Sequence, residues 1–324
     1  MQPITLKRAV EDPLSNFLLG QDQLVTALVL GQPAEMVFPS QRILKPITVD
    51  SLSYKWTSFG VERLRRYDTR RGLRAEIKTA DWKVSYETGS LKRYSFAVPK
   101  DDAELAAALP SLNVRERSAA MARMIVEKDI ESIAANLLST VTTYPVSHRL
   151  AIAGGSEWDT AGGDSKADVQ SIVEAICDDT GLQKSQLSVF LGRKAYEAAQ
   201  KDPVLAAQRL YTGGIQPAMA SLLAEYWDVG EVWTANPIIA ADHADTVSPM
   251  YGDIAIVYYN GGGQAWDTSY GDLTFGATFG WSRGASLEPY RMPNTTTWYF
   301  PWETWVEHNI INNLCGGIIT NCHS

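Results

Sequence analysis

The sequence lacks the patterns that most often reveal a metal, a cofactor or a catalytic centre. Its 324 residues include only three cysteines and four histidines, and none of these stands in a CxxC pair, an HExxH helix or a GxSxG turn. Cys177, Cys315 and Cys322 make a poor disulfide framework and suit a reducing compartment, so we expect three free thiols. Cys315 and Cys322 also lack zinc-site spacing with His308 and His323. We therefore expect no metal, no cofactor and no enzymatic activity.

Long apolar runs are absent as well. The most apolar stretch, from Leu24 to Leu30, is far too short to span a bilayer. The N-terminus also lacks the basic-then-apolar pattern of a signal peptide. With 45% hydrophobic and 20% charged residues, the chain can bury a sizeable core, and its length favours two or more lobes. We expect a soluble globular protein without membrane contact.

Charge is distributed unevenly along the chain. Residues 1–100 hold 16 Lys and Arg against 10 Asp and Glu, a balance of +6, so the remaining residues carry −14 of the total of −8. A split of this size suggests a polyanionic partner, or self-association in which the basic segment of one subunit meets the acidic surface of another.

The longest regular pattern covers residues 113–141 and predicts one amphipathic helix without Gly or Pro. Asn113, with Glu116 three residues later, is a plausible N-cap. Charged residues, among them Glu131, are expected on the solvent side. The apolar stripe recurs at three- and four-residue spacing and comprises Val126, Ile130, Ile133, Leu137 and Val141.

The first 100 residues lack an obvious core of their own. Residues 1–48 mix short apolar runs with five prolines, which predicts an extended arm with one short helix near 21–30. From 51 to 98, short alternating segments rich in aromatic and β-branched residues predict a long two-stranded β-loop with bends near Gly72 and Gly89. An isolated ribbon is only marginally stable in water, so this one must pack on something outside itself.

A dense basic run lies on this predicted β-loop. Between residues 63 and 74 the only acidic side chain is Asp68. Clustered arginines pair well with phosphate, so DNA binding and intersubunit ion pairing are the two competing uses. The arginines of the run are Arg63, Arg65, Arg66, Arg70, Arg71 and Arg74.

Tryptophans gather in the run WYFPWETWVEH at residues 298–308. Trp298, Trp302 and Trp305 around Pro301 resemble a sugar-stacking platform in composition, which would suit a carbohydrate-binding or carbohydrate-active protein. We favour a simpler interpretation, in which the run forms a strand pair that packs against the long helix.

Residues 151–269 have the pattern of a compact α/β lobe. A helix is predicted from Lys166 to Thr180, with Asp164 or Ser165 as its cap and Gly181 as its stop. The pattern then predicts a buried strand at 187–192, helices at 194–200, up to 210 and at 218–227, and a strand at 231–235.

The order of these segments resembles that of the major capsid proteins of tailed double-stranded DNA bacteriophages. The stretches LSVFLGRKAYEAAQKDPVL and YTGGIQPAMASLLAEYWDVGEVWTANPII carry the resemblance. MYGDIAIVYYN, LTFGATFGW and GGIITNC look like the last strands of the same family. The resemblance covers the chain from about residue 50 to 324 in element order.

The resemblance implies the Hong Kong 97-type capsid fold, an α+β fold. It implies an N-terminal arm (1–48), an extended β-loop (49–99), a peripheral domain with a β-sheet and a spine helix (100–150 and 270–324, helix 113–141) and an α/β axial lobe (151–269). The implied function is that of a major capsid protein, assembling as hexamers and pentamers into an icosahedral shell around packaged double-stranded DNA. An encapsulin-like cellular compartment is the alternative within this fold.

The same resemblance implies partners and a location. The partners are other copies of the chain, a portal, a decoration protein outside and DNA on the inner face. Because the arm starts at Met1, a separate scaffolding protein is expected. The location is the virion capsid, assembled in the cytoplasm of the bacterial host. In the resembling fold the extended loop lies over an adjacent subunit, so we predict intersubunit contacts for the six arginines, Trp56 and Trp82.

Overall fold

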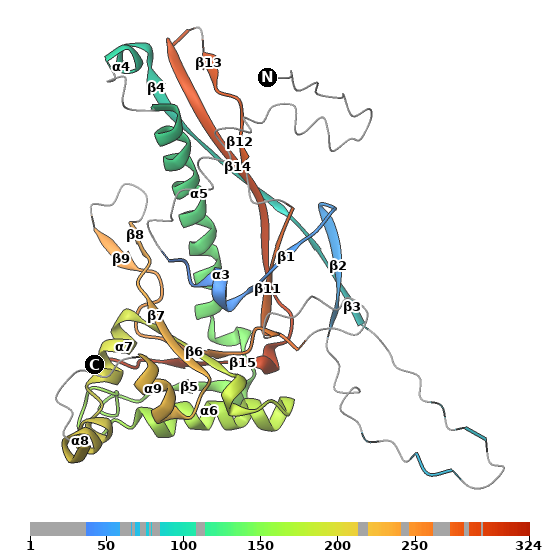
Figure 1. Ribbon diagram of the computed structural model, residues 1–324, viewed down its shortest axis with the longest axis vertical. Helices are drawn as coiled ribbons and strands as arrows, with labels where there is room; N and C mark the ends of the chain where they lie inside the picture. The colour runs from blue at the N-terminus through green and yellow to red at the C-terminus, as the bar shows by residue number, and fades with distance from the viewer. Residues whose placement is uncertain are drawn as a thin grey trace, which may run out of the picture. The chain divides into compact units, whose positions relative to one another are not determined.

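The computed structural model describes residues 37–58, 66, 69–71, 76–77, 79, 85–107, 114–212, 220–240, 246–261, 273–281, 285–292 and 294–324. The predicted helix near 21–30 and the predicted bend at Gly72 lie outside these residues. The described chain divides into two units. Residues 92–130 and 280–306 belong to the first, and residues 36–91, 131–279 and 307–324 to the second (Figure 1). Helix α5 (Val114–Ser139) and strand β14 (Thr297–Ile310) run from one unit into the other.

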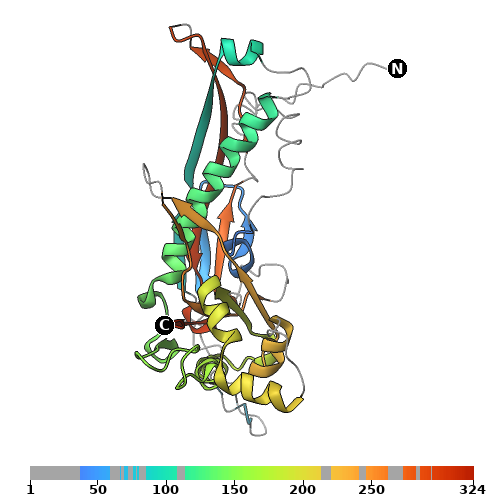
Figure 2. The same ribbon diagram turned by 90° about the vertical axis from the view of Figure 1, so that its left-hand side faces the viewer.

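The first unit is a sheet with a helix along one face. β14 pairs antiparallel with β4 and also with β12 and β13. Trp302 of β14 and Val98 of β4 are buried against Ala119, Ala122 and Val126 of α5, and Figures 1 and 2 show the helix lying along the sheet. Alanines leave room for the indole, which is why the helix can approach the strands closely. The other elements of this unit are β4 (Lys92–Asp101), α4 (Asp102–Ala107), β12 (Ala285–Ser286) and β13 (Tyr290–Met292).

Packing of the tryptophan-rich run against the long helix is thus confirmed at Trp302. The run itself forms one strand, β14, rather than a strand pair, and its partner is the distant β4. Pro301 sits within β14 opposite Ala97 of β4.

The second unit is built on a five-stranded sheet of order β5-β15-β10-β6-β7. β10 pairs antiparallel with β15 and β6, while β5 with β15 and β6 with β7 are parallel pairs. The strands are β5 (Arg149–Ala151), β6 (Ser188–Gly192), β7 (Glu231–Ala235), β10 (Ala255–Tyr258) and β15 (Gly316–Thr320). The helices are α3 (Ser40–Ile43), α6 (Ser165–Thr180), α7 (Arg193–Gln200), α8 (Pro203–Thr212) and α9 (Ala220–Trp227).

Shorter elements complete the second unit. Its single-turn helices are η2 (Val141–Thr143), η3 (Val146–His148), η4 (Lys184–Gln186) and η6 (Asn313–Cys315). Its remaining strands are β1 (Lys45–Thr48), β2 (Ser53–Ser58), β3 (Ser85–Ser90), β8 (Ile238–Ala240), β9 (Val247–Pro249) and β11 (Gly276–Gly280). β1 lies beside β11, and β2 with β3 and β8 with β9 form two-stranded ribbons.

Both faces of the five-stranded sheet are buried, because side chains alternate between two cores along each strand. In β10, Ala255 and Val257 face a core that includes residues of α6, α7 and α9, whereas Ile256 and Tyr258 face a second core. That second core takes in the end of α5 and the residues around α3. This explains why β6 and β10 are continuous apolar runs in the sequence.

The helix caps and strands predicted for the α/β lobe are found in the structure. Asp164 caps α6 by accepting a hydrogen bond from the amide of Ala167 at 3.0 Å, and Gly181 ends the helix with φ of 73°. The predicted strands at 187–192 and 231–235 are β6 and β7, and the predicted helices are α7, α8 and α9. No helix in the described part of the chain has the length and apolar character needed to cross a membrane.

The long helix is confirmed as α5, but its predicted buried stripe is only partly right: Val126 is buried and Ile130 packs against the core of the first unit. Ile133 is 39% exposed and Val141 is 40% exposed, whereas Glu131, expected on the solvent side, is 1% exposed. At about 100° per residue, the side chains buried after residue 130 are turned by roughly a third of a turn from those buried before it. Each unit therefore buries a different face of α5. The buried side chains are Ser118, Ala119, Ala122, Val126, Glu131, Ala134, Ala135 and Leu138.

Candidate functional site

The base of the predicted β-loop is the ribbon of β2 and β3. The two strands pair antiparallel from Ser53 opposite Ser90 to Ser58 opposite Ser85. A bend was expected near Gly89, but Gly89 itself lies inside β3, opposite Tyr54. A Cβ atom at Gly89 would stand 2.6 Å from the Tyr54 ring, so glycine serves here to admit the ring, not to turn the chain.

One face of the ribbon is occupied within the chain. The Tyr54 ring stacks on Phe279 at a centroid distance of 4.2 Å, and the Tyr54 hydroxyl accepts a hydrogen bond from Asn309 Nδ2 at 2.6 Å. Burial, with the negative charge of Glu307, raises the pKa of Tyr54 well above its usual range. Trp56 packs on the same Phe279 and is 5% exposed. Little of its ring is left for a second subunit, so we keep the intersubunit prediction for the arginines and not for Trp56.

Exposed side chains mark the outer part of the ribbon and the segment that leaves it. Tyr86 of β3 is 62% exposed and Ile77 is 71% exposed. The structure also places Arg66, Arg70 and Arg71 at the surface. The remaining members of the predicted contact set, Arg63, Arg65, Arg74 and Trp82, lie outside the described residues.

A buried carboxylate that the sequence does not mark holds the chain just before the ribbon. Glu131 of α5 accepts hydrogen bonds from the Ser40 amide at 3.1 Å, the Ser40 hydroxyl at 2.5 Å and the Tyr251 hydroxyl at 2.5 Å. Burial raises the pKa of Glu131, and these hydrogen bonds offset only part of that rise. Burial and the adjacent Glu131 charge raise the pKa of Tyr251. Since Ser40 is the first residue of α3, Glu131 fixes where residues 38–44 meet the long helix.

The tryptophans of the first unit do not form a flat platform. Trp302 is 1% exposed. Trp305 meets Trp281 edge to face at 6.1 Å and donates through Nε1 to Glu303 Oε1 at 3.0 Å. Arg93 completes this group with an ion pair to the buried Glu303 at 2.5 Å. Sugar stacking needs an open aromatic face, and the buried Trp302 does not provide one.

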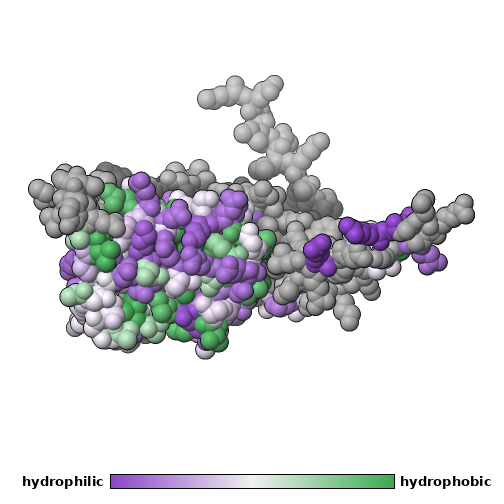
Figure 3. Space-filling model, turned by 90° about the horizontal axis from the view of Figure 1, so that it is seen from below, coloured by the Kyte–Doolittle hydropathy of each residue, from purple (hydrophilic) through white to green (hydrophobic). Residues whose placement is uncertain are grey.

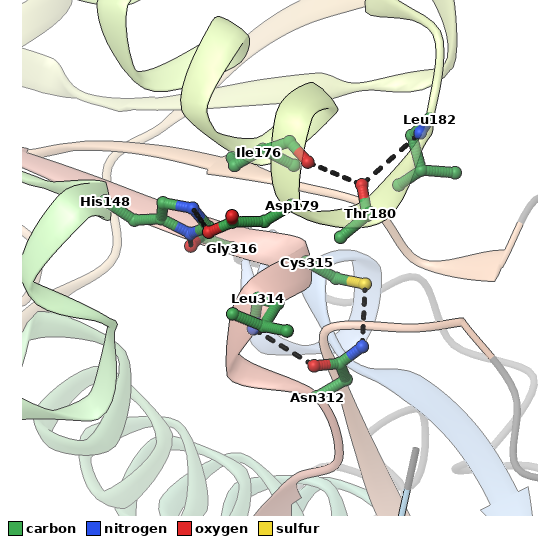
Figure 4. Close-up of polar contacts among 9 residues, drawn as sticks. All are labelled: His148, Ile176, Asp179, Thr180, Leu182, Asn312, Leu314, Cys315 and Gly316. Atoms are coloured by element: carbon green, nitrogen blue, oxygen red, sulfur yellow. Dashed lines mark hydrogen bonds and ion pairs between the residues drawn. The ribbon is translucent and has the colours of Figure 1, made fainter. Parts of the chain in front are cut away.

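The cysteine side chains pack as small apolar groups. All three sulfurs are unbonded to one another, and Cys315 and Cys322 are buried. Cys315 Sγ accepts a hydrogen bond from Asn312 Nδ2 at 3.3 Å, as Figure 4 shows. Burial raises the pKa of Cys322 well above its usual range, which disfavours the reactive thiolate. Among the described residues, no cluster of His, Cys, Asp and Glu could hold a metal ion.

The surface of the second unit seen in Figure 3 is mixed. Hydrophilic side chains cover much of the described area, and hydrophobic ones stand in separate spots between them. Such a surface favours contacts made by ion pairs and hydrogen bonds over a single large apolar interface.

No protein-family model and no curated protein sequence matches the chain. Solved structures do match it over nearly its whole length. A phage-related protein from Bordetella bronchiseptica RB50 is similar with a TM-score of 0.72 at 20% identity, covering 94% of this chain and 97% of that one. The capsid of Cyanophage P-SCSP1u gives a TM-score of 0.57 at 11% identity, covering 91% and 90%.

The chain has the fold of phage capsid proteins. This confirms, at the level of fold, the resemblance found in the sequence. An encapsulin from Synechococcus elongatus is also similar, with a TM-score of 0.53 at 10% identity, covering 98% of this chain and 99% of that one. The fold is therefore shared by phage capsid proteins and an encapsulin, and it does not choose between them.

Sequence reasoning identified the arginine run but missed the Ser40, Glu131 and Tyr251 group. These residues are separated by 91 and 120 positions in the chain. No local signal marks Glu131, because the charged Glu127, Lys128 and Asp129 precede it in α5.

Proposed function

We propose that this chain is a major capsid protein, which assembles as hexamers and pentamers into an icosahedral shell enclosing double-stranded DNA. The observation that carries the proposal is the likeness to capsid structures along more than nine-tenths of the chain. In this proposal the protein is not an enzyme, and its role is to form the shell by packing against other copies of itself. Its partners are other copies of itself, a scaffolding protein, a portal and a decoration protein, and it is assembled in the host cytoplasm.

The proposal assigns roles to particular elements. Residues 1–48 form the arm, 49–99 the extended loop with the ribbon of β2 and β3 at its base, and 151–269 the axial lobe. The peripheral domain comprises residues 100–150 and 270–324, with α5 as its spine helix. The exposed Tyr86 on the ribbon and the exposed Ile77 in the segment between its strands support the assignment of the loop, because exposed apolar side chains need a partner surface.

An encapsulin-like compartment is the second candidate, since an encapsulin shares the fold. The two differ in what the shell encloses, nucleic acid or cargo protein. A carbohydrate-binding role for the tryptophan-rich run has less support, because Trp302 is buried and Trp305 packs edge-on to Trp281.

Size-exclusion chromatography and negative-stain imaging of the purified chain, alone and with co-expressed scaffolding protein, would test the proposal. We expect closed shells, or hexamers and pentamers that close into shells when the scaffolding protein is present. A discrete small oligomer under both conditions would contradict both shell proposals. Nuclease-protected DNA inside particles from infected cells would support the capsid proposal. A single enclosed protein species would instead support the encapsulin-like compartment.

A further inference from the structure

Residues 321–324 lie between two loops at one end of the five-stranded sheet. After β15 the chain turns at Asn321 with φ of 60°, a backbone conformation that asparagine adopts more readily than most residues. Beyond the turn, the Cys322 carbonyl accepts from the Trp158 amide at 3.0 Å, and the Cys322 amide donates to the Asp253 carbonyl at 3.1 Å. The segment therefore connects the loop before α6 with the loop before β10.

A single carboxylate, Asp159, binds the end of this segment. The Ser324 amide donates to Oδ1 at 3.0 Å and the Ser324 hydroxyl donates to Oδ2 at 3.0 Å, so both carboxylate oxygens are engaged. Nε2 of His323 lies 3.7 Å from Oδ2. Burial opposes ionisation of Asp159, but the hydrogen bonds from Ser324, together with His323, lower the pKa of the carboxyl. Asp159 therefore holds the last two residues as an ionised acceptor.

The loop that carries Asp159 is also held by contacts that do not involve the C-terminal residues. The Gly155 amide donates to Glu157 Oε2 at 2.7 Å. Trp158 is fully buried and donates through Nε1 to Asp168 of α6 at 2.9 Å. The loop can thus keep its shape when the C-terminal segment leaves it.

The three cysteines differ in what covers them. Cys322 is fully buried in the core that includes α6, and it belongs to the bound segment itself. Cys315 is fully buried in the second core, on the other face of the sheet, where Asn312 donates to its sulfur. Cys177 of α6 is half-buried. Opening of the C-terminal segment alone would uncover Cys322 and leave Cys315 covered.

The position of the segment favours such local opening. β15 pairs on both sides, with β10 and with β5, whereas residues 321–324 follow the end of this strand. Segments beyond the end of a sheet open at a lower free energy than its central strands.

We propose that residues 321–324 form a strap, which Asp159 latches across the end of the sheet and which opens locally to uncover the Cys322 thiol. The thiol reports opening, because it moves with the strap. This inference concerns the folded chain and goes beyond the proposed shell function, so the failure of one leaves the other standing.

Asp159→Asn and Glu157→Gln form a matched pair, because each removes one carboxylate charge from the same loop, and Glu157 is bonded to Gly155 instead of the strap. Alkylation of the folded full chain with N-ethylmaleimide, followed by mass spectrometry of peptides, measures each thiol separately. We expect Asp159→Asn to react at Cys322 about tenfold faster than the wild type, since asparagine offers one acceptor oxygen where the carboxylate offers two. Glu157→Gln should react at the wild-type rate, and Cys315 should stay slow in all three proteins.

Equal Cys322 rates in Asp159→Asn and the wild type would overturn the proposal. Parallel acceleration of Cys315 would also overturn it, because both cores would then open by unfolding of the whole unit. Ser324→Ala carries the test if Asp159→Asn yields no folded protein. It removes one of the two bonds from Ser324 and should raise the Cys322 rate about threefold. An unchanged rate in that variant would overturn the proposal in the same way.

Discussion

At the scale of single residues, the buried Glu131 carboxyl of the second unit has hydrogen-bond partners that fit either of its protonation states. Glu131 can be satisfied with or without a proton, because its Oε2 meets only the Ser40 hydroxyl, which can donate or accept. Its Oε1 accepts from the Ser40 amide and the Tyr251 hydroxyl in either state.

Glu131→Gln should therefore be tolerated, whereas Glu131→Ala should not. The amide of glutamine can donate to Ser40 Oγ and accept at the position of Oε1, so we expect a change in unfolding free energy within about 1 kcal/mol. Alanine leaves the Ser40 amide and two hydroxyls buried without an acceptor, at a cost of about 2–4 kcal/mol. Chemical denaturation of both variants at neutral pH measures the difference.

The pH dependence of the same variants has a definite sign. Since the pKa of Glu131 is raised in the folded chain, the folded state takes up a proton before the unfolded state does. This group therefore adds stability as the pH falls through its folded pKa, and the gain is complete below its ordinary value of 4.5. Glu131→Gln should lack this contribution. A wild type that loses stability relative to Glu131→Gln over that range would contradict the assignment.

At the scale of elements, α6 and α5 differ in how much of them can be predicted. Asp164 and Gly181 act within one turn of the helix that they delimit, so α6 follows from local sequence. The existence of α5 also follows from its uninterrupted pattern. Its buried face does not, because alanines provide much of the contact and the apolar Met121 and Ile133 remain exposed.

Neighbouring substitutions in α5 test the corrected face. Ala134 is buried and Ile133 is largely exposed. Ala134→Asp places a charge in a core without a partner, which should cost several kcal/mol and reduce soluble folded protein, while Ile133→Asp should stay within about 1 kcal/mol of the wild type. Circular dichroism melts of the two variants provide the comparison. The reverse order would show that the helix faces are assigned wrongly.

At the scale of the whole molecule, the uneven charge of the chain bears on assembly. Changing Arg65, Arg66, Arg70 and Arg71 to Glu should leave the subunit folded but prevent closed shells, because the basic segment would no longer meet acidic surface on a neighbour. Each exposed ion pair contributes at most about 1 kcal/mol, but in the proposed shell the contact would recur at every subunit boundary. Imaging of particles, with circular dichroism of the unassembled chain, measures both outcomes.

Changing the same four arginines to Lys provides the matched control, since it keeps the charge and should keep assembly. High salt should weaken assembly of the wild type by screening. Normal shells from the Glu variant, combined with weaker binding of nucleic acid, would instead make the run a DNA-binding element.

The candidate surface could be predicted from sequence only in part. The arginine run is visible because like charges are contiguous in the chain. The buried face of the ribbon cannot be predicted in this way. Trp56 packs on Phe279 and Tyr54 bonds to Asn309, and both partners lie more than 200 residues away in sequence.

One consequence of the chain path concerns cooperativity. α5 and β14 each begin in one unit and end in the other, so melting either unit would strip stabilising contacts from a helix and a strand that both share. Calorimetry should accordingly show a single transition with equal calorimetric and van't Hoff enthalpies. Proline at Asp129, just before the boundary, breaks the helix at a cost of about 3 kcal/mol and should split this transition into two. The shared helix and strand would thus make the two units melt as one thermodynamic unit.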